Sequence, residues 1–162
     1  ETVDALEALP QAIIAQVHGH CYTGALELIL GCDLIICADD ASIGDTHGQW
    51  GLIPVWGMSV RLPERVGVSK ARELSFTARR ISGLEAAEMG LAVRSVPLDE
   101  LEDAVATTAG QIASNSAGTV SMMKRLITDS QNMPRTNALQ RERTLPYGRP
   151  DDMEERMRAG GR

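Results

Sequence analysis

The chain has 162 residues, of which 43% are hydrophobic and only 3% aromatic, and its formal net charge at neutral pH is −6. This length predicts a single domain, with a core built mainly from aliphatic side chains and methionine. An acidic chain without a block of basic residues is a poor partner for nucleic acid or for an anionic membrane surface. The longest apolar runs have the length of strands, so we expect no membrane span.

The three cysteines, Cys21, Cys32 and Cys37, cannot all pair within one chain. The first residues show no secretory signal, so we expect reduced thiols in a cytoplasmic protein. Cys21 lies beside His18 and His20, which raises the possibility of a metal site. No second pair of ligands follows at a spacing typical of zinc, and we therefore expect no metal ion.

Predicted strands and helices alternate along the first part of the chain. Residues 1–10 have the composition of the end of a helix. A β-branched apolar run then predicts a strand over 12–17, and a run that is apolar nearly all round predicts a buried helix over 25–32. A second apolar run predicts a strand over 34–38. This order of strand, turn, helix and strand indicates an α/β fold.

Further along, helices become more frequent and finally exclusive. Loop residues fill 45–51, and the next elements are helices over 58–66, 69–77 and 82–89 and a strand over 91–96. Ser82 and Glu85 have the spacing of a capping box, and Ser69 is the expected cap of its helix. From Leu98 onward only helical patterns occur. We therefore predict an α/β region over 1–97 and a helical segment over 98–162.

Glu27 lies one turn inside the predicted buried helix. A carboxylate at such a position is costly unless it is paired or used in chemistry, and the residues alone leave both interpretations open. Gly24 comes immediately before this helix. It has no Cβ, so a ligand can closely approach the backbone N–H groups that point out of the first turn.

The stretch over 11–67 resembles the crotonase, or enoyl-CoA hydratase/isomerase, superfamily. The matching runs are AQVHGH at 15–20, GALEL at 24–28, CD at 32–33, ASIG at 41–44, GLIP at 51–54, RLP at 61–63 and VG at 66–67, with a weaker likeness to about Asn132. The resemblance implies a ββα spiral core followed by an all-helical C-terminal segment that assembles subunits as trimers or hexamers. Family members place roughly a further third of their fold ahead of this point, so the core over 1–97 is expected to be partial.

The resemblance also implies a chemistry. The family binds acyl-CoA thioesters and stabilises an enolate with two backbone N–H groups, of which Gly24 matches one. Glu27 matches one of the two catalytic glutamates of the hydratases, which handle water and the α-proton. Coenzyme A enters as part of the substrate, and no separate cofactor is expected.

The position of the second glutamate is occupied by His47. Imidazole can act as acid or base near neutral pH, with Asp45 or Glu27 orienting it. The alternative is an ordinary solvated loop histidine. Trp50, Trp56 and Met58 surround the motif and are candidates to line an acyl pocket, although Trp50 is also a candidate core residue.

Two classes of function follow from these residues. The first is an acyl-CoA enzyme, with hydration of a 2-enoyl-CoA as the leading reaction and isomerisation or C–C or thioester hydrolysis through His47 as alternatives. The second is a catalytically idle subunit that serves assembly. Gly24 and Glu27 favour the enzyme, whereas His47 and the partial core favour the idle subunit.

Overall fold

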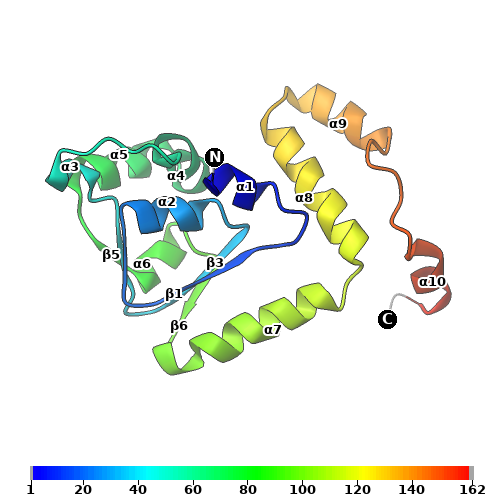
Figure 1. Ribbon diagram of the computed structural model, residues 1–162, viewed down its shortest axis with the longest axis horizontal. Coiled ribbons are helices and arrows are strands. Elements are labelled where there is room, and N and C mark those ends of the chain that lie inside the picture. Colours follow the sequence, from blue (N-terminus) through cyan, green and yellow to red (C-terminus); the bar gives the residue numbers. More distant parts are fainter. Residues whose placement is uncertain (1, 161–162) are drawn as a thin grey trace. The chain divides into compact units, whose positions relative to one another are not determined.

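The computed structural model describes residues 2–160, which form two compact units (Figure 1). The first unit holds Ile13–Thr107 together with the N-terminal residues up to Ala8. The second holds Thr108–Arg162 with Leu9–Ala12. The α/β architecture predicted from the sequence is confirmed. The boundary predicted between residues 97 and 98 stays a prediction, as does the assembly role of the helical segment.

A three-stranded parallel sheet forms the base of the first unit. Its order is β1 (Ile14–Val17), β3 (Leu34–Ala38) and β6 (Arg94–Val96), with Ile36 opposite both Gln16 and Arg94. The last four residues of β3 are all buried, as expected for the central strand of a parallel sheet. The predicted strand over 91–96 is shorter in the structure because residues 91–93 lie in a turn.

A second small sheet carries the loop that leads to the candidate site. Its order is β2 (His20–Tyr22), β4 (Ser42–Gly44) and β5 (Ile81–Ser82), where β2 and β4 are parallel and β4 and β5 antiparallel. Cys21 is buried on one face of β2, while His20 stacks on Tyr22 on the other. Cys21 and His20 thus lie on opposite faces of the strand.

Within the described residues 2–97, six helices accompany these sheets. They are α1 (Thr2–Glu7), α2 (Gly24–Leu30), α3 (His47–Trp50), α4 (Met58–Val66), α5 (Val68–Thr77) and α6 (Gly83–Glu88). Ser82 caps α6 as predicted, because its Oγ accepts the Glu85 N–H at 3.1 Å. Two expectations were wrong: a one-turn helix, α3, replaces part of the predicted loop, and Gly67 rather than Ser69 caps α5.

Side chains from both sheets and from α2, α4, α5 and α6 form one aliphatic core. Its fully buried members include Leu26, Ile36, Ile43, Leu62 and Leu74. One face of α2 packs into this core through Leu26 and Leu30, which fixes the position of its one charged side chain, Glu27. The expectation of a helix buried all round was wrong, because Leu28 is 43% exposed.

Helices alone make up the C-terminal part of the chain. A short turn, η1 (Leu98–Glu100), leads into α7 (Leu101–Ala113), and α8 (Ala117–Gln131), α9 (Arg135–Arg143) and α10 (Met153–Arg158) follow. None of the residues of α8, α9 and α10 is fully buried. Polar contacts link these helices: the Tyr147 hydroxyl donates to Asp129 at 2.5 Å, and the Ser116 hydroxyl donates to Asp152 at 2.6 Å. In the described chain, no helix is both long and apolar enough to cross a lipid bilayer.

The buried thiols give a first test of this core. Burial raises the pKa of Cys21 and of Cys37 to about 11. At pH 8 roughly 0.1% of each thiol is then ionised, against several per cent or more for an ordinary cysteine. We expect Cys21 and Cys37 of the native protein to react with a chromogenic disulfide reagent far more slowly than after denaturation in guanidinium. Rapid modification of both thiols in the native protein would contradict the packing described here.

Candidate active site

The Glu27 carboxylate is buried and fully engaged. Only 2% of the residue is exposed, and the carboxylate lies one turn from the start of α2. Its Oε1 accepts the backbone N–H groups of Trp56 at 2.8 Å and Met58 at 3.3 Å. Two amide donors on one oxygen offset part of the cost of burying the charge and fix the direction of the second oxygen, Oε2.

The loop that supplies these amide donors is itself held in place. The Arg61 Nη1 donates to the Trp56 carbonyl at 2.8 Å, and the same guanidinium contacts Asp4 at 2.7 Å and Glu7 at 2.6 Å. Burial would lower the pKa of Arg61, but the hydrogen bonds to Glu7 and Asp4 outweigh it and raise that pKa. A charged residue of α4 therefore ties α1 to the loop that binds Glu27.

His47 completes a row of three ionisable side chains. It is the first residue of α3 and is 7% exposed, so the interpretation as a solvated loop histidine was wrong. Its Nε2 lies 3.4 Å from the Glu27 Oε2, and its Nδ1 lies 2.7 Å from the Asp45 Oδ1. Asp45 is also buried, at 3% exposure. The imidazole thus lies between two carboxylates in a site that is largely closed to water.

The turn before α2 adopts a strained conformation. Thr23 has a φ of 50°, which is unusual for a β-branched residue. Its N–H donates to the Gly44 carbonyl at 3.1 Å and its own carbonyl accepts from the Glu27 N–H at 2.9 Å. Among the described residues the Gly24 N–H finds no hydrogen-bond acceptor. The strained turn therefore leaves the Gly24 N–H, the donor predicted from the sequence, without a partner among the described residues.

The three predicted pocket residues have different environments. Trp50 is 73% exposed, so the alternative that it belongs to the core was wrong. Trp56 is half-exposed, and a Cβ on Gly24 would lie 3.1 Å from its ring. The Met58 side chain is buried in the core, while its amide faces Glu27. The roles of these residues toward a ligand stay predictions.

Sequence reasoning missed the two amide donors to Glu27. No residue-type pattern marks a backbone N–H as a partner, and only the glycine before Met58 hinted at an unusual turn. Gly57 adopts a φ of +105°, which orients the Trp56–Met58 segment toward α2.

The same chain order and fold occur in known proteins. The sequence profile of the family described as enoyl-CoA hydratase/isomerase matches residues 1–159. The structure of enoyl-CoA hydratase from Bacillus anthracis superposes with a TM-score of 0.93 at 38% identity, over 98% of this chain and 62% of that one. A Thermobifida fusca structure solved in complex with acetoacetyl-CoA superposes with a TM-score of 0.82 at 33% identity, over 86% and 55%.

Sequence relatives show the same partial coverage. Carnitinyl-CoA dehydratase of Proteus mirabilis is 36% identical over 73% of this chain and 45% of its own length. The chain spans about half the length of the curated relatives it matches.

The loop that binds Glu27 provides a stability test. Gly57→Ala should lower Tm more than the matched variant Gly51→Ala. Both glycines have positive φ, +105° and +64°, so each variant carries a backbone cost of roughly 1–2 kcal/mol. Only at Gly57 does the new methyl collide with the Arg61 guanidinium; at Gly51 it meets nothing within 4 Å. Equal losses of Tm in thermal unfolding would show that the Arg61 contact contributes nothing to this loop.

Proposed function

Because the chain belongs to the enoyl-CoA hydratase/isomerase family, we propose that it processes acyl-CoA thioesters, with hydration of a 2-enoyl-CoA as the leading reaction. The observation that carries this proposal is the contact between two buried proton-transferring groups, the Glu27 carboxylate and the His47 imidazole, 3.4 Å apart. Coenzyme A would enter as part of the substrate. The chemistry assigned to these residues needs no further cofactor.

Hydration of a 2-enoyl-CoA requires two proton transfers, and an enolate forms between them. A water oxygen bonds to the β-carbon while one of the pair, Glu27 or His47, accepts a water proton. The α-carbon of the enolate then takes a proton from the other group, which must hold that proton when the substrate binds. The Gly24 N–H would donate to the thioester oxygen on which negative charge develops, and one such donor contributes about 3–4 kcal/mol.

Hydrolysis is the second candidate, and one observation favours it. The Asp45–His47 pair, with 2.7 Å between the carboxylate oxygen and Nδ1, has the arrangement that activates water or a hydroxyl as a nucleophile. In thioester hydrolysis, water would bond to the carbonyl carbon and give a proton to His47, the C–S bond would break, and the departing thiolate would take that proton from His47.

Crotonyl-CoA is the probe that tests the proposal. We expect the purified protein to remove the enoyl-thioester absorbance, and Glu27→Gln to lower kcat by about 100-fold or more, because the amide keeps the shape but not the acid–base function. Loss of absorbance without release of a free thiol indicates hydration, whereas a stoichiometric thiol signal indicates hydrolysis.

Glu88→Gln is the matched control for this variant, since Glu88 is an exposed glutamate at the end of α6. It should leave both kcat and Tm unchanged. If Glu27→Gln unfolds the protein more easily yet keeps the activity per folded molecule, Glu27 is a structural residue. If the unmodified protein turns over neither crotonyl-CoA nor other acyl-CoA thioesters, the proposal fails in favour of an idle assembly subunit.

Assembly is the second part of the proposal. The helices α8 to α10 bury no residue fully, and they expose Met123, Ile127, Leu139 and Met157. Apolar side chains left at a helical surface favour association with another copy. We expect light scattering at micromolar concentration to give the mass of a trimer or hexamer, and a clean monomer would contradict this part of the proposal.

A further inference from the structure

We propose that Asp45 is a positioning residue that selects the tautomer of His47, so that Nδ1 keeps its proton and Nε2 exchanges protons beside Glu27. The inference rests on the proposed function only in assigning proton transfer to His47. It does not depend on whether the enzyme hydrates, isomerises or hydrolyses its substrate.

Asp45 holds His47 through two contacts. Its Oδ1 lies 2.7 Å from the imidazole Nδ1 and also accepts the backbone N–H of His47 at 3.3 Å. The contact with the backbone N–H holds the Asp45 carboxylate at the start of α3 independently of the imidazole. Because an ionised carboxylate only accepts hydrogen bonds, the short contact with Nδ1 requires the proton to reside on that nitrogen.

The opposite side of the ring has a looser contact. Nε2 lies 3.4 Å from the Glu27 Oε2, a longer separation than the one at Nδ1. Glu27 cannot turn to follow the ring, because its Oε1 is held by the amides of Trp56 and Met58. When His47 has one proton to keep, the shorter bond retains it, and Nε2 becomes the nitrogen that gains and loses a proton.

The two carboxylates, and not other charged groups, determine which ring nitrogen of His47 carries the proton. Within the described part of the chain, the side chains in ion-pair contact with His47 are those of Asp45 and Glu27. Helix α5 packs against α3, and its charged residues Lys70, Arg72 and Glu73 are exposed to solvent. Arg61 of α4 is engaged by Asp4 and Glu7 instead.

Asp45 also supplies a negative charge, which the imidazole itself does not carry. When His47 takes a proton from water it becomes a cation, and a carboxylate in contact with Nδ1 stabilises that cation without itself taking the proton. The free imidazole in water prefers its proton on Nε2, which would leave the wrong nitrogen facing Glu27. A carboxylate two residues before the histidine therefore allows an imidazole at this position to accept and donate protons through Nε2.

The tautomer can be measured directly by ¹⁵N NMR on the uniformly labelled protein. The ring signals of His47 are identified by their loss in His47→Gln, which separates them from those of His18 and His20. On the alkaline side of the titration we expect Nδ1 to show the shift of a protonated nitrogen and Nε2 that of a bare one. A neutral His47 with its proton on Nε2 would overturn the proposal, and this result needs no variant of Asp45.

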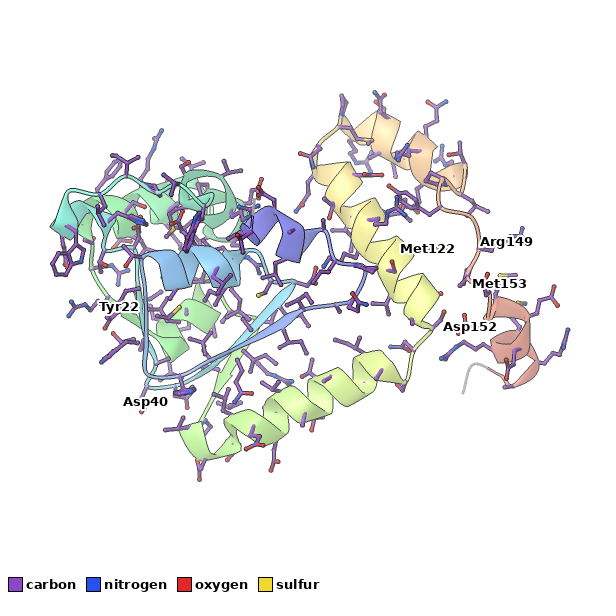
Figure 2. All side chains as sticks on the ribbon, in the orientation of Figure 1. Tyr22, Asp40, Met122, Arg149, Asp152 and Met153 are labelled. Atoms are coloured by element: carbon purple, nitrogen blue, oxygen red, sulfur yellow. The ribbon has the colours of Figure 1, made fainter. Side chains whose placement is uncertain are left out.

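Asp45→Asn gives the second measurement. The amide can donate to Nδ1, so the proton should move to Nε2, and kcat with crotonyl-CoA should fall about 100-fold or more. The matched control is Asp40→Asn, an exposed aspartate in the turn between β3 and β4 (Figure 2), which should change neither quantity. An unchanged tautomer in folded Asp45→Asn would overturn the proposal.

The two proposals fail in distinguishable ways. Absence of turnover in the unmodified protein, together with a proton on Nδ1, would refute the proposed function and leave the positioning by Asp45 intact. Turnover in the unmodified protein together with a proton on Nε2 would refute the positioning by Asp45 and leave the proposed function intact.

Discussion

The structure of the first unit depends on one buried carboxylate. Moving an ionised group away from water is among the most costly steps in folding, and removing one partner of a buried charge pair costs about 3–5 kcal/mol. Two segments contact the Glu27 carboxylate: the Trp56–Met58 loop through two amide N–H groups, and the first residue of α3 through its imidazole. The turn at Thr23 contacts the backbone of Glu27 instead, because the Thr23 carbonyl accepts the Glu27 N–H at 2.9 Å.

The same constraint explains what sequence could and could not predict. Apolar runs revealed β1, α2 and β3, because most of their side chains are apolar and each contributes to the core, although Gln16 of β1 and Leu28 of α2 are exposed. The strands β2 and β5 have three and two residues, which is too short for any period to appear. The helix α3 has four residues, too few to show a helical period; its start is held by Asp45, whose Oδ1 accepts the His47 N–H, and it packs against α5.

Within the candidate site, side-chain identity was predictable and geometry was not. His47 was predicted either to act beside Glu27 or to be an ordinary solvated loop residue, and its burial between the carboxylates of Asp45 and Glu27 contradicts the second alternative. The amide partners of Glu27 could not be predicted because every residue except proline offers an N–H. Their selection depends on the positive φ of Gly57 and on the Arg61 hydrogen bond to the Trp56 carbonyl.

The two units are stabilised by different kinds of interaction. The first has an aliphatic core that holds α2 and with it the Glu27 carboxylate. In the second, polar contacts such as the Arg141–Asp129 ion pair and the Ser116–Asp152 hydrogen bond link helices that bury no residue fully. Surface ion pairs of this kind each contribute little to stability, so the helices α8 to α10 lack the contribution that burial of apolar side chains gives the first unit.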